Sequence, residues 1–382
     1  MFAWLLWDLH VLVLLLSASL TILFAVTTKN VFSLKKTNFI PVFFIVIAQI
    51  YVVRDLNTNA LISALLRIII LSVVLLLQDK IKIELVHFFT KDFTILLSVS
   101  LFAWILFLMG IPLPNSITNF NNGQYFYDNY YFFLLDHRDH FLAFPRFSSI
   151  FLEPGQLGMI TSFLLYANQF DLKRKEVWVL LVATVLSFSL AAYVLTLFSA
   201  SAFVLLKTRR LVLYLIIWIG FIFAGYLYFT KSNNGNNPIN ISIIERLFIQ
   251  DGDIVGNNRY SSIMDNYFDN FMKSDDIYTG VGTGKYQILK LGANAGYKVF
   301  IFQYGIIGTV LVFLFYLSLV RNYESKLSMT FLIVYILCFI QAAYPLWECE
   351  LLIFITAMPF LKSLKINSFH PKKNDAKYIS AA

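Results

Sequence analysis

An arginine and a glutamate mark the place where a polar segment gives way to a long apolar one. Arg146 stands at the boundary, and Glu153 follows inside the apolar sequence, directly before Pro154 and Gly155. A charge in such a place costs about 2.5–3.5 kcal/mol on insertion scales, so it usually faces a protein interior or a wet cavity. Because proline cannot donate to the carbonyl four residues back, we expect a kinked or broken helix there. The segment predicts either a kinked helix end with a snorkelling arginine or a binding cleft at a membrane surface.

A second arginine lies in a later polar region. Arg259 is followed by Tyr260 and can grip a phosphate or carboxylate through two parallel N–H bonds, which lysine does less well. Alone, it is more typical of an ordinary amphipathic loop helix whose charges, such as Asp265, face water. Together, Arg146 and Arg259 suit a pyrophosphate group. The tyrosines near these arginines suit sugar stacking and hydroxyl recognition: Tyr125, Tyr127, Tyr130, Tyr131, Tyr260 and Tyr267.

A glycine-rich stretch, residues 280–284, is followed by Lys285. It fails the spacing of an ATP phosphate loop and lacks the serine or threonine after the lysine. We therefore interpret it either as a turn whose Gly282 and Gly284 let a substrate approach the backbone, or as a flexible turn. Arg67 lies in the middle of an apolar run, where it is either functional or paired with a carbonyl or carboxylate of a neighbouring helix.

No combination of histidines and cysteines has the spacing of a metal site. His137 and His140 lack further ligands, and Cys338 and Cys349 lie in or beside apolar runs without a second ligand pair. We therefore expect no metal, no cofactor and no disulfide framework.

The composition is that of a membrane protein. Hydrophobic residues make up 59% of the chain, charged residues 14%, and the mean hydropathy is +0.71, whereas soluble domains are about 25% charged. We expect an all-α, polytopic transmembrane helical bundle that forms a single integral domain over residues 1–382. The net charge of +8 lies mostly in short loops, where it signals topology rather than nucleic-acid binding.

About eleven spans satisfy the length of roughly 20 residues that a membrane requires. They cover roughly 5–26, 39–53, 59–77, 93–110, 147–169, two within 177–206, 211–230, 298–320, 329–345 and 347–364. The short basic loops, including 27–38, 78–92 and 170–176, are then cytoplasmic. Residues 177–206 are short for two crossings, so a re-entrant pair turning near Ser187 to Ala191 is the alternative. Two long loops, 111–146 and 231–297, fall on the outside, and loops of such length are usually functional.

The order of these motifs resembles the O-antigen polymerase family, within the wider O-antigen ligase and polymerase superfamily. Four pieces carry the resemblance: Arg146 with Glu153-Pro154-Gly155 entering a span, Asn258-Arg259, the glycine stretch 280–284, and Asn294 followed by Gly305-Ile306-Ile307-Gly308. The ligase branch has a histidine-asparagine pair before this last span. Residues 292–296 hold no histidine, which favours a polymerase over a ligase.

The resemblance implies a metal-independent, GT-C-like glycosyltransferase embedded in the bacterial inner membrane, with its active site facing the periplasm. Such an enzyme transfers a growing glycan from undecaprenyl pyrophosphate onto a new lipid-linked repeat unit. Arg146 and Arg259 would hold the pyrophosphates, and Glu153, then Asp265, is the preferred base, unless no base is needed. Its substrate-binding residues would be Gly282, Gly284, Asn294, Arg67 and Tyr260. Its partners would be the lipid bilayer and the chain-length regulator and flippase of the same pathway, and no nucleic acid is expected.

Two other classes of protein stay open. A lipid-linked oligosaccharide flippase or another transporter would have a charged central cavity and internal repeats, whereas this sequence has one central arginine and no repeat. A structural or sensor membrane protein would not need arginines in two external loops.

Overall fold

Apolar helices make up most of the structure. The computed structural model describes residues 9–56, 58–120, 125–137, 145–208, 261–289, 291, 296–342 and 345–363, with shorter pieces at 220, 223, 226–228, 230–231, 249–250 and 253–254. Its first helices are α1 (His10–Thr27), α2 (Lys36–Val52), α3 (Thr58–Leu76), α4 (Asp79–Leu108), α5 (Pro154–Ala167), α6 (Lys175–Leu186) and α7 (Leu190–Thr208). The later ones are α9 (Ser262–Phe271), α10 (Asp276–Thr279), α11 (Thr283–Leu289), α12 (Tyr297–Asn322), α13 (Lys326–Gln341) and α14 (Glu348–Ser363).

Four of the described helices are long and apolar enough to cross a membrane, namely α3, α4, α12 and the Leu190–Lys207 part of α7. At 1.5 Å per residue they are about 27–45 Å long, which matches a hydrocarbon core of about 30 Å. Three shorter apolar stretches lie at Val11–Thr27, Lys36–Val52 and Lys326–Ile340. The structure therefore has the makeup of a helical membrane protein, and the number of spans stays a prediction.

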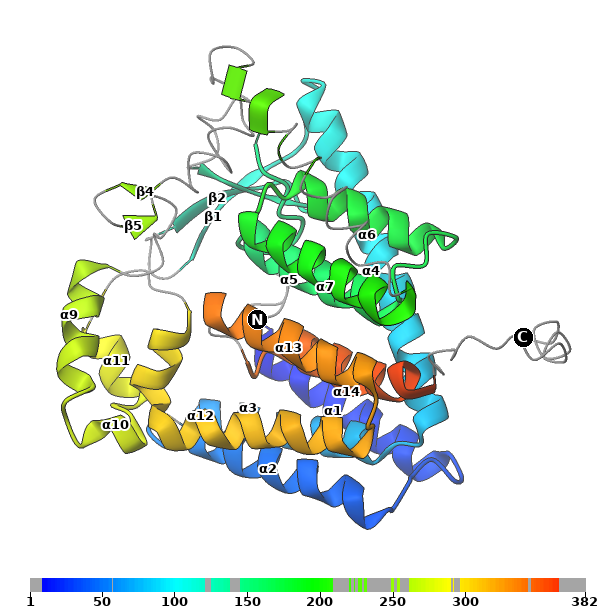
Figure 1. Cartoon of the computed structure of the whole chain (residues 1–382), viewed down its shortest axis with the longest axis vertical. Helices are drawn as coiled ribbons and strands as arrows, with labels where there is room; N and C mark the ends of the chain where they lie inside the picture. The colour runs from blue at the N-terminus through cyan, green and yellow to red at the C-terminus, as the bar shows by residue number, and fades with distance from the viewer. Residues whose placement is uncertain are drawn as a thin grey trace, which may run out of the picture.

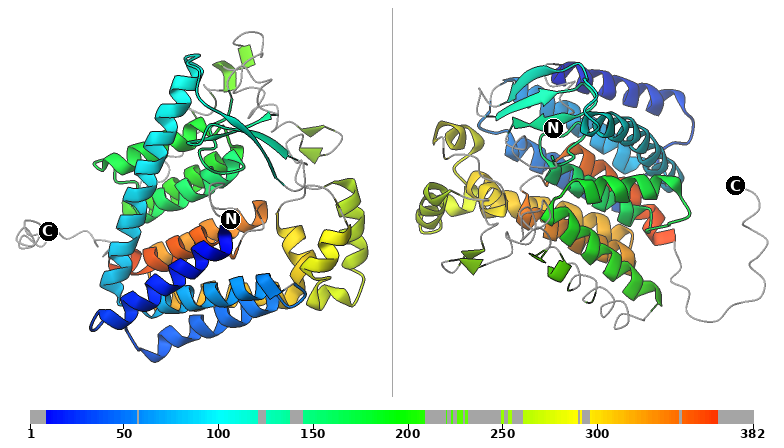
Figure 2. Two further views of the ribbon diagram at one scale, coloured as in Figure 1. Left: turned by 180° about the vertical axis from the view of Figure 1, so that it is seen from behind. Right: turned by 90° about the horizontal axis from the view of Figure 1, so that it is seen from above.

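Helix α5 is buried along its whole length. Every residue from Pro154 to Ala167 is buried except Gly155, and a helix that is apolar all round belongs in a core. Helices α6, α7, α13 and α14 pack against α5, while α12 packs along α2. Most helices lie side by side, and α4 runs across them at a large angle (Figures 1 and 2).

Two helix starts differ from the sequence prediction. The span expected at 147–169 begins only at Pro154, which occupies the first turn of α5. The proline does not kink the helix there, because a first-turn residue needs no intrahelical N–H bond. The stretch 78–92, expected to be a loop, is the first half of α4. Its buried Lys82 is tolerated because its ammonium donates to the Leu75 carbonyl (2.7 Å) and the Tyr323 hydroxyl (3.1 Å).

Residues 177–206 form two helices, α6 and α7, whose turn lies at residues 187–189. This turn is at the start of the range that the sequence indicates. Helix α6 has 12 residues, so it is about 18 Å long and shorter than a membrane core.

The connections between helices separate into two ends of the bundle (Figure 1). The α1–α2, α3–α4, α5–α6 and α12–α13 connections gather at one end, which we call the basic end because lysines and arginines lie in these connections or in the adjoining helix turns. Hydrogen bonds join them: Asn322 donates to the Thr37 carbonyl (2.8 Å), and Tyr166 donates to the Leu327 carbonyl (3.0 Å). Helices α9, α10 and α11 lie at the opposite end, here called the loop end. The grouping of the loops and their sides of the membrane stay predictions.

The two predicted loops contain regular structure, so the all-α class describes only the bundle. Residues 111–146 hold the antiparallel sheet β1 (Ser116–Phe120), β2 (Tyr125–Asn129) and β3 (Leu134–Asp136), with β2 in the middle. Strand β1 pairs Thr118 with Tyr127, and β3 pairs Leu135 with Asp128. Residues 231–297 hold α9, α10, α11 and the short pair β4 (Ile249–Gln250) and β5 (Asp253–Ile254).

Candidate substrate-binding site

Residues 145–153 form an irregular segment that is fixed at several points. Phe147 is fully buried, its N–H donates to the Leu186 carbonyl (3.0 Å), and its ring meets Trp104 edge-on at 5.5 Å. The Ser148 hydroxyl donates to the Leu134 carbonyl of β3 at 2.7 Å. The segment therefore sits between the end of α6, helix α4 and the sheet, which holds it without regular secondary structure.

This segment carries the two residues that the sequence singles out first. Arg146 is half-buried beside Phe147, and Glu153 is exposed at the residue that precedes α5. Its backbone is extended, and its side chain makes no capping hydrogen bond. A carboxylate next to a helix N-terminus is favoured by the helix dipole. Glu153 is thus exposed rather than held in a protein interior, while its expected place in a wet cavity stays a prediction.

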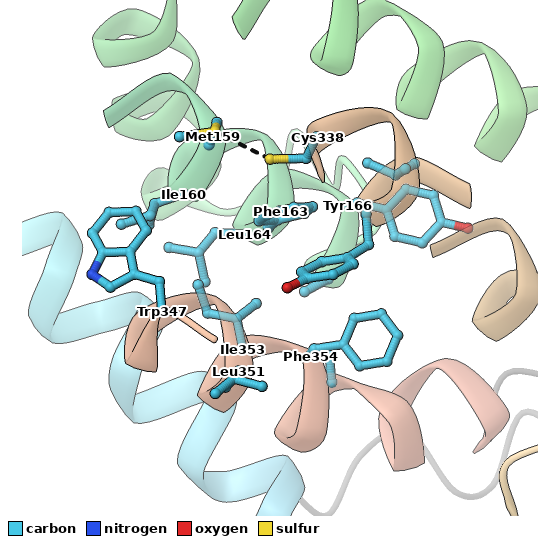
Figure 3. Close-up of a cluster of buried hydrophobic side chains, with 14 of the residues drawn as sticks. Met159, Ile160, Phe163, Leu164, Tyr166, Cys338, Trp347, Leu351, Ile353 and Phe354 are labelled. Atoms are coloured by element: carbon cyan, nitrogen blue, oxygen red, sulfur yellow. Dashed lines mark hydrogen bonds between the residues drawn. The ribbon is translucent and has the colours of Figure 1, made fainter. Parts of the chain in front are cut away.

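The start of α14 packs against this segment. The Phe151 ring meets the Trp347 ring edge-on, with centroids 5.9 Å apart. Figure 3 shows the Trp347 indole beside Ile160 of α5. The next residue, Glu348, forms an ion pair with Arg67 of α3, whose Nε lies 2.5 Å from the Glu348 Oε1. Of the alternatives for Arg67, the structure therefore shows the one in which it pairs with a carboxylate of a neighbouring helix.

A second carboxyl group lies two residues further along α14. Glu350 is 3% exposed, and the Cys338 thiol points at it from 3.9 Å while lying 3.1 Å from the Met159 sulfur. Sequence reasoning missed both glutamates. Their signal is visible in the sequence, because two carboxylates at the start of an apolar run are rare and expensive in a membrane. Among the described residues, no group of three or more histidine, cysteine, aspartate or glutamate side chains could hold a metal ion.

The glycine stretch docks on a break in α12. Gly305 has φ 64° and ψ −171° inside that helix, a conformation open in practice only to glycine. The break frees two carbonyls of α12, which accept from the glycine stretch: Val281 N–H donates to Phe302 O and Gly282 N–H donates to Gln303 O, both at 2.9 Å. The backbone of Gly280 lies so close to Gly305 that a Cβ on either residue would clash.

The α2–α3 turn fills the space beside the glycines where a substrate is expected. Tyr51 donates to the Thr279 carbonyl at 2.8 Å, and Arg54 donates to the same carbonyl at 2.5 Å while stacking on the Tyr51 ring. A Cβ at Gly282 would lie closer than 3.0 Å to the Asp55 carboxylate, and one at Gly284 would lie 3.1 Å from the Asp55 carbonyl. The space beside Gly282 and Gly284 is therefore filled by Asp55 of the same chain rather than by a substrate. This corrects the substrate-binding role expected for the two glycines.

The aromatic residues divide into a buried and an exposed set. Tyr127 and Tyr130 are 2% and 8% exposed, so neither ring is available to stack on a sugar, which corrects the role expected for both. Tyr130 stacks on Phe133 instead, with ring centroids 4.7 Å apart. Tyr131 and Tyr267 keep 46% and 43% of their surface and stay candidates for sugar contact.

Arg259, Tyr260 and Asn294 lie outside the residues that the structure describes, as does the side chain of Tyr125. The expected convergence of Arg146 with Arg259 therefore stays a prediction.

Comparison of the chain with protein-family models, curated proteins and solved structures finds no match. The resemblance to O-antigen polymerases rests on the motifs in the sequence, and the function is inferred from the site.

Proposed function

We propose that this chain is a membrane-embedded polysaccharide polymerase that acts on undecaprenyl-pyrophosphate-linked oligosaccharides at the periplasmic face of a bacterial inner membrane. The observation that carries the proposal is the segment 145–153. It holds a half-buried arginine and an exposed glutamate on one firmly packed stretch of backbone, at the end of the bundle where both long loops lie.

The reaction needs charge stabilisation at the leaving group and a route for one proton. A hydroxyl of the new repeat unit attacks the anomeric carbon of the growing chain, and the bond from that carbon to the pyrophosphate oxygen breaks. Arg146 would stabilise the negative charge that develops on the pyrophosphate, an electrostatic role best served by a preorganised group. Glu153 would accept the hydroxyl proton, because it is exposed and follows on the same segment.

The contacts of α12 weigh against the transporter alternative. Discontinuous membrane helices in transporters leave backbone groups that bind ions or substrate. Here the carbonyls of Phe302 and Gln303, freed by the break, already accept hydrogen bonds from the glycine stretch. The break therefore supports a docking role better than a transport site.

The test is the surface polysaccharide of a strain that lacks the gene and is complemented with variants. We expect Arg146→Ala to leave single repeat units without long chains, since losing such a donor costs about 2.7–4 kcal/mol, or roughly 10²–10³ in rate. Arg321→Ala, an exposed arginine at the end of α12, is the matched control and should give a normal ladder on a gel. A normal ladder from Arg146→Ala, at a membrane level equal to wild type, would refute the mechanism.

The proposed base has its own test. Glu153→Gln should slow chain growth in membrane vesicles while leaving the protein level unchanged, because the amide keeps the shape of the side chain and cannot accept the proton. A fully active Glu153→Gln enzyme would exclude Glu153 as the base, and Asp265 would then be tested in the same way.

A further inference from the structure

Among the described residues near the candidate site, Arg67 and Glu348 form an ion pair that is largely enclosed. The Arg67 Nε and the Glu348 Oε1 have no accessible surface, while the two side chains keep 25% and 18% of theirs. Arg67 lies near the middle of α3, a helix long and apolar enough to cross a membrane. An unpaired charge at that depth would be costly. The Glu348 carboxylate therefore offsets the charge of Arg67 inside the bundle.

A neutralised arginine is poorly suited to bind a phosphate. Its net attraction for an anion is small, and a phosphate placed beside it would also lie near the Glu348 carboxylate, where like charges repel. The geometry instead connects the ion pair of Arg67 and Glu348 to the segment 145–153. Glu348 directly follows Trp347, whose ring packs on Phe151 at 5.9 Å, and Phe151 lies two residues before Glu153.

We propose that Arg67 is a positioning residue: its ion pair with Glu348 fixes the start of α14 and, through Trp347, the segment 145–153. Arg67 then makes no contact with the substrate, which replaces the role that the sequence resemblance gives it. The inference rests on the proposed function to the extent that this segment carries the reacting groups.

Paired substitutions separate positioning from substrate binding. Removing one partner leaves an unpaired buried charge, whereas replacing both partners of a buried ion pair by apolar residues of similar size is often neutral. We expect Arg67→Met and Glu348→Met each to lower the rate of chain growth by at least about tenfold. The double variant Arg67→Met/Glu348→Met should recover to within about threefold of wild type, because strongly coupled partners are not additive.

The assay is chain growth in membrane vesicles, with a lipid-linked repeat unit as substrate and the protein level measured by immunoblot. Positioning predicts that the single variants lower kcat and leave KM for the repeat unit within about twofold, whereas a lost phosphate contact raises KM. An inactive double variant at normal protein level would overturn the proposal. If the double variant fails to accumulate, Arg67→Lys distinguishes positioning from substrate binding. Lysine keeps the charge that pairs with Glu348 but lacks the planar guanidinium that binds a phosphate through two hydrogen bonds. Activity near wild type supports positioning, and a raised KM overturns it.

A cross-link tests the geometry without any activity. Arg67→Cys and Glu348→Cys are combined in a chain whose Cys338 and Cys349 are replaced by alanine, and a short bismaleimide is added to membranes. A cross-link between α3 and α14 is expected, and its absence would overturn the pairing. A cross-link together with a normal ladder from Arg146→Ala would refute the proposed function and leave the ion pair standing.

Discussion

Gly305→Ala is the sharpest test of how the loop end is built. At φ 64° and ψ −171° an alanine would be strained by about 1–3 kcal/mol. Its Cβ would also lie closer than 3.0 Å to backbone atoms of Tyr278, Thr279 and Gly280, and such overpacking typically costs about 1–3 kcal/mol. Since backbone cannot rotate away as a side chain can, we expect a total loss of about 2–6 kcal/mol in the free energy of unfolding.

The measurement is the thermal stability of the detergent-solubilised protein, followed as the fraction that stays monodisperse in size-exclusion chromatography. Gly155→Ala is the matched control, because a Cβ there would meet only the Ser189 hydroxyl at an ordinary 3.8 Å. This variant should be at least as stable as wild type, since alanine favours a helix over glycine by about 0.5–1 kcal/mol. Equal stability of Gly305→Ala and wild type would refute the docking of the glycine stretch on α12.

Three further predictions address packing and placement. Pro154→Ala should change thermal stability by no more than about 1 kcal/mol, because a first-turn proline can be replaced without losing a hydrogen bond; a larger loss would contradict the helix start. Lys82→Ala should destabilise the protein by about 1–3 kcal/mol, measured in the same way, because it leaves a buried carbonyl and the Tyr323 hydroxyl without their donor; wild-type stability would contradict that network. Phe132 is 55% exposed on a hairpin that packs on Phe107 at the end of α4. A nitroxide label at this position should collide more with oxygen than with a water-soluble nickel chelate, as at a membrane interface. More collisions with the nickel chelate would place the hairpin in water.

The apolar helices can be predicted from the sequence, because a run of apolar residues is identified without knowing which segments it contacts. Their ends are harder to predict, since they depend on contacts between distant segments. The basic stretch 78–92 is helical because Lys82 finds acceptors on α3 and at the end of α12. The sheet in residues 111–146 depends on pairing between strands, such as Thr118 with Tyr127, and on side chains like Asn129, which accepts from the Tyr131 N–H at 2.8 Å.

The candidate site shows the same division. Arg146 and Glu153 can be singled out from their neighbours in the sequence, and so can the unusual depth of Arg67. The partner of Arg67 cannot be identified from the sequence, because Glu348 comes close to Arg67 only when α14 packs on α3. The glycine stretch is likewise visible as a motif. The group that packs against it, the Asp55 carboxylate, belongs to a turn far away in the chain and cannot be identified from the motif.

These contacts give the α2–α3 hairpin a role that neither helix has alone. At its turn, Tyr51 and Arg54 hold the glycine stretch through the Thr279 carbonyl. Further along α3, Arg67 holds the start of α14 through Glu348. One hairpin therefore sets the positions of two segments, one that ends the long loop 231–297 and one that packs on the loop carrying Arg146. Under the proposed function the reacting groups must be held within about 0.5 Å of their working geometry, and a frame shared by both segments would meet that demand better than two independent supports.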